Sequence, residues 1–155
     1  MPMLNRKVLI GVDCDENRLA LGFVAVYGNL KGLTQSPSLL PDKLDAFGRH
    51  LYWMTRGLRG CTNQRMKNFQ GIGIGLPKQF VCDATRESIQ KQMKEFWDIP
   101  IYLDDRELLE IKGKTWLTSL AHVIDSRSNP SELDLSIIYG AAKMALDNTP
   151  LAKYP

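Results

Sequence analysis

Three aspartates, Asp13, Asp105 and Asp134, occupy positions from which their carboxylates could do chemistry together. Asp13 and Asp105 each follow an apolar run that is typical of a buried strand, and sites in an open α/β sheet lie outside the carboxyl ends of the strands. Asp134 falls in the first turn of a predicted helix that we expect to pack on the same sheet. We predict that these acids are catalytic, although each position also suits a turn residue or a helix start.

Carboxylates brought together in this way would repel one another without a cation. Mg²⁺, or Mn²⁺ in its place, takes oxygen ligands and suits such a site. Two such ions can clamp a phosphodiester, one activating water and the other stabilising the leaving oxygen. The pattern therefore predicts that Asp13, Asp105 and Asp134 are also the metal ligands.

A basic stretch could grip the phosphate backbone of a nucleic acid. It contains Arg56, Arg59, Arg65 and Lys67, with Tyr52 and Trp53 just before it. Lys and Arg neutralise phosphates, so we predict these four cations as nucleic-acid contacts. A solvated basic face with aromatic residues in the core is the alternative interpretation.

Other patterns carry less chemistry. The glycines at 71, 73 and 75 lack the spacing of a dinucleotide loop. Cys82 has no His partner nearby in the sequence, so we interpret it as an inert packed residue. His50 and His122 have no companion ligand at a helical offset, so each is interpreted as a surface or packed residue.

The acids must be positioned by strands, and the chain contains four strand-like runs. A strand over Lys7–Asp13 is predicted to be central, flanked by Leu19–Tyr27, its hairpin partner, and by the strand near Ile99–Leu103. A further short strand over Gly71–Gly75 is predicted to be central, and its glycines indicate that its end closely approaches a ligand or a neighbouring backbone. Turn signals predict a loop over residues 28–37.

Helical periodicity fills the intervals between these strands. A helix opens at Pro41-Asp42 and ends at Gly57 and Gly60. Three more helices are predicted. One begins after Asp83 or Thr85, one covers Glu107–Val123, and the last starts near Pro130-Ser131. The order β-β-(α)-β-α-β-α-α favours an α/β sheet with parallel pairs.

Length and composition limit the class of protein but do not identify a function. The 155 residues fit one domain, 1–155 with a core of about 7–147, and the net charge of +3 permits a nucleic-acid partner. The three cysteines include no CxxC pair, and no apolar run approaches the roughly 18 residues of a membrane span. Met1 to Lys7 is too short for a secretory signal, so a cytoplasmic protein with no membrane partner is expected.

Four segments, taken in order, resemble the YqgF/RuvX family. Ile10-Gly11-Val12-Asp13 followed by Arg18-Leu19-Ala20 is similar to the opening of that family, and Ile74-Gly75-Leu76-Pro77 to its Gly-Leu-Pro strand end. The segment 99–106 resembles its strand ending in Asp-Glu-Arg, and Leu133-Asp134 its closing motif. The resemblance spans roughly residues 7 to 147.

This resemblance implies a ribonuclease-H-like fold, a mixed sheet with helices on both faces, in a single domain related to RuvC resolvases. It implies a metal-dependent nuclease acting on structured RNA, notably the precursor of small-subunit ribosomal RNA, or on branched DNA. It also implies that Arg18 and Arg106, which accompany the acids, contact nucleic acid, and it leaves a homodimer open.

The sequence departs from the family pattern at several points. Asp15 replaces the glycine after the first acid, Ala20 replaces a second loop glycine, and Asp105 replaces the Glu of Asp-Glu-Arg. The Ser or Thr that usually follows is missing from Glu107-Leu108-Leu109. Three alternatives therefore stand beside the nuclease: a RuvC-like Holliday junction resolvase, a catalytically weak nucleic-acid-binding module, and a partner-binding protein that keeps only the fold.

Overall fold

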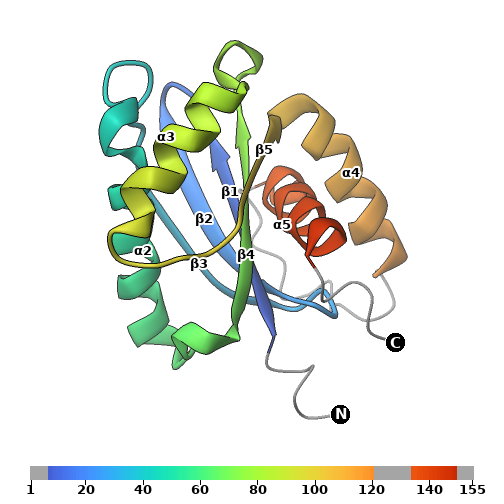
Figure 1. Cartoon of the computed structure of the whole chain (residues 1–155). Coiled ribbons are helices and arrows are strands. Elements are labelled where there is room, and N and C mark those ends of the chain that lie inside the picture. Colours follow the sequence, from blue (N-terminus) through green and yellow to red (C-terminus); the bar gives the residue numbers. More distant parts are fainter. Residues whose placement is uncertain (1–6, 121–133, 150–155) are drawn as a thin grey trace.

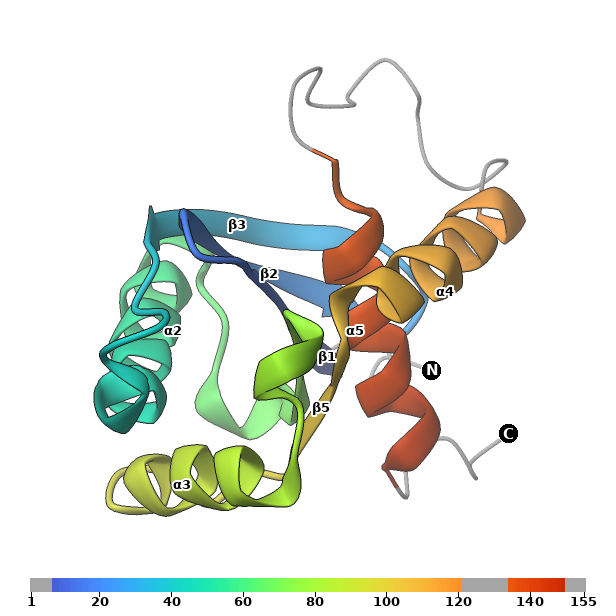
Figure 2. The ribbon, with the colours of Figure 1, turned by 90° about the horizontal axis from the view of Figure 1, so that it is seen from above.

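The computed structural model describes residues 7–120 and 134–149. Within them, five strands form one mixed sheet in the order β3-β2-β1-β4-β5. Helices α2 and α3 cover one face, and α4 and α5 cover the other (Figures 1 and 2). The predicted α/β fold, a mixed sheet with helices on both faces, is confirmed. The strands are β1 (Val8–Cys14), β2 (Arg18–Ala25), β3 (Leu30–Pro37), β4 (Phe69–Leu76) and β5 (Ile101–Asp105).

The first strand, β1, is central and fully buried, as its continuous apolar run predicts. It pairs antiparallel with β2 and parallel with β4. The prediction that the strand near Ile99–Leu103 flanks it is wrong. That strand, β5, pairs with β4 instead and lies at the edge of the sheet, because the glycine-rich run of β4 is itself a buried central strand.

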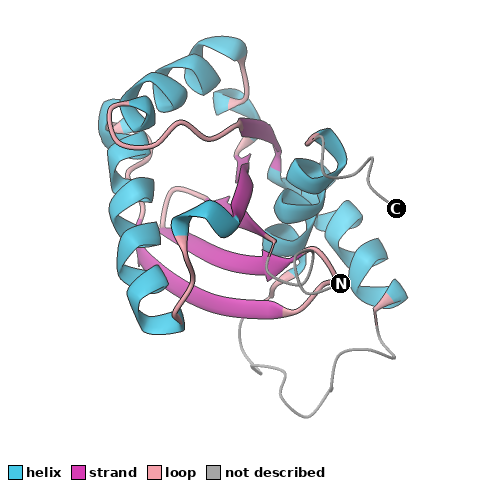
Figure 3. Ribbon diagram, turned by 60° about the horizontal axis from the view of Figure 1, so that its bottom comes forward, coloured by secondary structure: helices cyan, strands magenta, loops and turns pink. Residues whose placement is uncertain are grey.

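The predicted loop over residues 28–37 is also corrected, because most of it forms the edge strand β3. β3 pairs antiparallel with β2, and its side chains are mostly half-buried or exposed. Gly32 and Pro37 suggested turns, but both residues are tolerated in an edge strand whose outer side needs no partner. Figure 3 shows β2 and β3 as the long curved strands of the sheet.

The helices shift at their ends relative to the sequence prediction. The 3-10 helix η1 precedes α2, and α2 runs through Gly57 and Gly60 rather than ending there. Residues 121–133, which include the predicted end of one helix and the start of the last, lie outside the described residues. Among described residues, no helix is long and apolar enough to cross a membrane. The helices are η1 (Leu44–Ala46), α2 (Phe47–Thr62), η2 (Met66–Asn68), η3 (Lys78–Phe80), α3 (Asp83–Lys94), α4 (Arg106–Ser119) and α5 (Ser136–Asn148).

Glycines let α5 lie directly on the backbone of its neighbours. A Cβ added at Gly73 would overlap the carbonyl of Ala141, and one added at Gly140 would overlap the carbonyl of Leu109 on α4. This confirms the close approach to a neighbouring backbone that the glycines of β4 predicted. The first turn of α5 reaches Gly75 through Ile137, so α5 begins near the carboxyl end of β4.

Gly140→Ala is expected to destabilise the protein by about 2 kcal/mol, because α4 and α5 must separate to admit the methyl group. Alanine is ordinarily about 1 kcal/mol better than glycine inside a helix. The matched control is Gly57→Ala in α2, where an added Cβ meets nothing within 4 Å, and it should stabilise. Urea unfolding of both variants measures the difference. A stabilised Gly140→Ala would contradict the backbone contact.

Candidate functional site

Asp13 is the charged residue at the centre of the candidate site. It is the penultimate residue of β1, and only 5% of its surface is exposed. Its Oδ1 accepts from Arg106, with Nε at 3.0 Å and Nη2 at 2.9 Å. The carboxyl end of the central strand therefore carries a buried carboxylate held by one guanidinium.

Arg106 reaches Asp13 across β4, at the level of Gly75. Arg106 is the first residue of α4, immediately after β5. Gly75 pairs with Asp13 on β1, and a Cβ placed on it would lie 3.3 Å from the Arg106 Cβ. A side chain at position 75 would therefore crowd the base of the Arg106 side chain.

Asp15 is a second acid at this guanidinium. Its Oδ2 lies 3.9 Å from Arg106 Nη2. Its Oδ1 accepts the backbone N–H groups of Asn17 and Arg18, both at 2.8 Å, which orders the turn between β1 and β2. Sequence reasoning noted Asp15 only as a replacement for a family glycine, and that departure was the available signal for it.

The two acids have opposite electrostatic environments. Burial raises the pKa of Asp13 above its usual value, even though the neighbouring Arg106 lowers it. Partial burial acts against the charge of Asp15 too, but hydrogen bonds from the Arg18 and Asn17 backbone and the charge of Arg106 hold its pKa below the usual value. The ionised form of Asp13 is thus costly to keep, which is common where a charge serves a function.

The other two predicted acids, Asp105 and Asp134, accept hydrogen bonds from backbone N–H groups at the starts of helices. Asp105 caps α4 by accepting the Glu107 backbone N–H at 3.0 Å. Asp134 precedes α5 and accepts the Ser136 backbone N–H at 2.9 Å, a bond that lowers the pKa of Asp134. Neither is among the charges that shift the pKa of Asp13. The described residues contain no group of three acids, histidines or cysteines that could hold a metal, and the assignment of Asp105 and Asp134 as ligands stays a prediction.

Strand register singles out Asp104 rather than Asp105 as the neighbour on the same side. Asp13 pairs with Gly75, and Gly75 pairs with Asp104. Paired residues of parallel strands point to one face, here the face covered by α4 and α5. Asp105 pairs with Leu76, which is buried against the α2 and α3 face.

The predicted nucleic-acid contacts divide into two groups. Arg106 and Arg18 belong to the turn and helix start around Asp13. The basic stretch lies elsewhere: Arg56 stacks over the Trp53 ring at 5.5 Å, Arg59 donates to the Gln64 carbonyl, and Arg65 and Lys67 are exposed before β4. The structure therefore does not gather all six cations at the acids.

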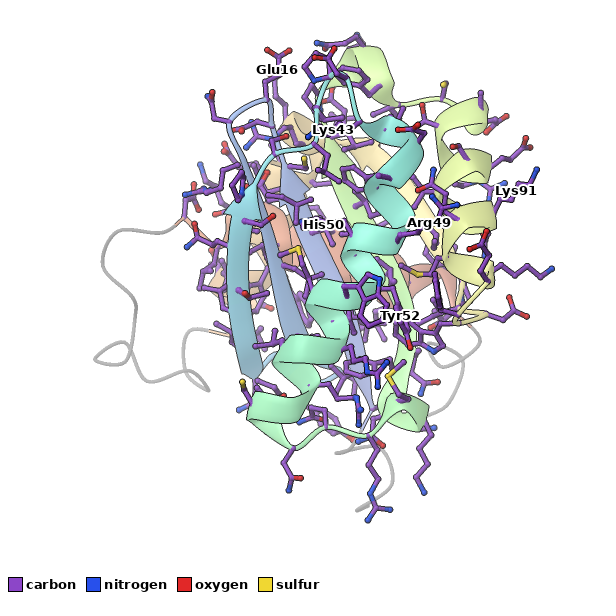
Figure 4. The ribbon with its side chains drawn as sticks, turned by 90° about the vertical axis from the view of Figure 1, so that its left-hand side faces the viewer. Glu16, Lys43, Arg49, His50, Tyr52 and Lys91 are labelled. Carbon is purple, nitrogen blue, oxygen red and sulfur yellow. The ribbon has the colours of Figure 1, made fainter. Side chains whose placement is uncertain are left out.

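Cys82 and His50 differ in how well the sequence described them. The packing assigned to Cys82 is wrong, because its side chain is exposed at the start of α3, with Sγ 3.3 Å from Thr85 Oγ1. His50 is half-buried between α2 and β3, with Nε2 2.8 Å from Ser36 Oγ (Figure 4), which agrees with a packed residue. His122 lies outside the described residues.

No protein-family model matches the chain, and no curated protein matches it in sequence. Among solved structures, it is similar to a ROK family glucokinase from Streptomyces griseus (TM-score 0.54, 16% identity, 69% of this chain and 36% of that chain). It is also similar to the ROK hexokinase of Thermus thermophilus (TM-score 0.52, 15% identity, 78% of this chain and 39% of that chain). The chain thus spans about two fifths or less of these kinases.

T. thermophilus RuvC, solved in complex with a Holliday junction substrate, matches with a TM-score of 0.43 and 14% identity over 88% of this chain and 90% of that chain. Structural likeness at such identities shows the fold alone. The resemblance to the YqgF/RuvX family stays a prediction from the sequence.

Proposed function

We propose that the protein is a metal-dependent nuclease that cleaves a phosphodiester bond of structured RNA or branched DNA beside Asp13. The observation that supports this most is the ion triad of Asp13, Arg106 and Asp15 at the carboxyl end of the central strand. A buried ion pair is weak as a stabilising device, because desolvation offsets much of the attraction. A charged acid kept at that position therefore favours a functional role.

The donor chemistry of Asp13 and Asp15 fits Mg²⁺ or Mn²⁺. Both supply carboxylate oxygens, and a cation, the Arg106 guanidinium, already lies between them. Mg²⁺ is usually held by one or two carboxylates together with phosphates of the substrate, so a complete cluster of protein ligands is not required. Asp13 and Asp15 would hold the ion. When bound, it would activate water or stabilise the leaving oxygen.

Arg106 has the chemistry to receive the phosphate of the substrate. Its planar guanidinium matches a phosphate group as well as a carboxylate. About a quarter of its side chain is exposed, whereas the carboxylate it holds is nearly buried. An incoming phosphate can therefore draw Arg106 outward, which orients the phosphate and leaves the Asp13 carboxylate open to a cation.

A second candidate function is nucleic-acid binding without cleavage. The specific observation that favours it is the arrangement of the acids: Arg106 already compensates Asp13, and Asp105 bonds to the start of α4. A protein with this arrangement could hold a phosphate backbone through Arg106 and never assemble a metal centre.

One experiment separates these functions. Wild-type protein is incubated with a structured RNA hairpin and with a four-way DNA junction, in Mg²⁺, in Mn²⁺ and in EDTA. We expect cleavage of one substrate with a metal and none in EDTA. The substrate cleaved decides between RNA processing and a RuvC-like resolvase activity. Binding without cleavage would favour the second candidate, and absence of both would contradict both proposals.

A further inference from the structure

A pocket of about 340 Å³ opens at the end of the sheet opposite Asp13. It lies at the start of β1, where Val8 lines it, and at the start of β3, where Lys31 does. The rest of its wall is the segment between α2 and β4. That segment contributes Asn63, Gln64, Arg65, Lys67 and Asn68.

The residues that line this pocket suit an anion. Lys31, Arg65 and Lys67 are all exposed, and within the described chain none of them is ion-paired with an acid. Among the residues that the structure describes, no acid lines the pocket, and three amide side chains add further donors. Three cations around one concave surface attract and can hydrogen-bond a phosphate group.

The segment that carries Arg65 and Lys67 is held in place by several hydrogen bonds. Asn63 ends α2 in the left-handed conformation, at φ 58°. The Gln64 N–H donates to the Arg59 carbonyl at 3.3 Å, and the Asn68 N–H donates to the Arg65 carbonyl at 2.9 Å within η2. Asn68 Nδ2 also donates to Gln64 Oε1 at 3.4 Å. These hydrogen bonds therefore fix the backbone positions from which the Arg65 and Lys67 side chains extend.

We propose that this pocket holds a backbone phosphate of the nucleic acid, remote from the bond that is cut. The inference rests on the proposed function and assigns a second contact to the same substrate. Asp13 lies five residue steps after Val8 in β1, about 17 Å along an extended strand. A nucleic-acid strand rises about 3.4 Å per nucleotide, so that distance corresponds to about five nucleotides. The pocket positions the substrate and touches no reacting atom.

The first test compares two variants that lose the same charge. Arg65→Gln with Lys67→Gln alters the pocket. Lys91→Gln with Lys94→Gln alters the exposed side of α3, from which Lys91 extends away from the molecule (Figure 4). Affinity for the RNA hairpin and the DNA junction is measured by fluorescence anisotropy from low to high salt. The pocket variant should bind about tenfold more weakly. Its salt slope should fall by about 0.9, the contribution of the one phosphate that the pocket holds, while the α3 variant stays near wild type.

The second test locates the phosphate directly. ¹⁵N-labelled wild-type protein is titrated with the RNA hairpin and, separately, with inorganic phosphate. We expect the hairpin to shift the backbone amides of residues 63–68. Shifts with inorganic phosphate but not with the hairpin would overturn the proposal, because the pocket would then serve a small phosphate. Equal losses in the two variants would overturn it as well, since net charge alone would explain them.

These outcomes are distinguishable from failure of the proposed function. If wild-type protein binds nucleic acid and the pocket variant binds with unchanged affinity and salt slope, the pocket proposal is wrong and the proposed function stands. If wild-type protein binds neither the hairpin nor the junction, the proposed function itself is wrong.

Discussion

Asp13→Asn is expected to lower turnover of the cleaved substrate about a thousandfold while the protein folds and still binds nucleic acid. Asparagine keeps the shape of the side chain and removes the charge that would hold a cation against the phosphodiester, and such charge stabilisation acts mainly in the transition state. Folding should survive because Arg106 is partly exposed and can turn its charge to solvent. Single-turnover cleavage in Mg²⁺ and in Mn²⁺, with binding measured in EDTA, gives the two quantities separately.

The matched control is Asp98→Asn, which removes one exposed acid from the segment between α3 and β5. It should cleave as wild type does. Asp105→Glu is the informative companion, because it restores the residue of the family pattern at the helix cap of α4. Activity kept or raised would support Asp105 as a ligand. Cleavage untouched by Asp13→Asn would place the active site elsewhere.

Arg106→Gln is expected to reduce the free energy of unfolding by about 3 kcal/mol at neutral pH, because it leaves the buried Asp13 carboxylate without its counter-charge. The loss should depend on pH. The folded-state pKa of Asp13 lies above its ordinary 3.8. Its protonated form therefore favours folding, a contribution present below 3.8 and lost as pH rises through the folded pKa. Without Arg106 that pKa rises further, so the difference between variant and wild type should grow with pH and then level off.

Urea unfolding in EDTA across this acidic window measures the effect without bound metal. Lys112→Gln provides the comparison, since it breaks an exposed pair with Asp147 at 3.1 Å and should cost at most about 1 kcal/mol. A pH-independent loss for Arg106→Gln, or one no larger than that of Lys112→Gln, would show that the pair with Asp13 does not form in solution.

The parts of the fold that the sequence predicted are those where local pattern and burial agree. β1 is a continuous apolar run because both faces of the sheet are covered, and its end at Asp13 follows directly. The glycines of β4 predicted a close backbone contact because small residues in a buried strand leave room for one. The strand β3 was missed because an edge strand is half-exposed and lacks the strong pattern of its neighbours.

The site was less predictable because it depends on contacts between distant residues. Asp13 and Arg106 are 93 residues apart in the chain and meet across Gly75. Asp15 joins them through Arg106, whose Nη2 lies 3.9 Å from Asp15 Oδ2. Proximity to strand ends indicated Asp105, whereas strand register, which the sequence alone does not reveal, turns Asp104 toward the side of Asp13. The roles of Asp105 and Asp134 stay predictions.

The separation of charge along β1 also affects how the protein meets a partner. Asp13 and Asp15 lie at one end of the strand, and Lys31, Arg65 and Lys67 lie around the other. Arg106 offsets much of the charge of the two acids, whereas no described acid lines the pocket around the three cations. The uncompensated positive charge at the pocket therefore contributes an electric moment along the strand direction, superimposed on a small net charge of +3. In the field of a polyanion that moment exerts a torque, so the protein should approach with the amino ends of β1 and β4 leading. Such steering raises association rates at low ionic strength and fades once the Debye length, about 10 Å at 0.1 M salt, is shorter than the separation of the two ends.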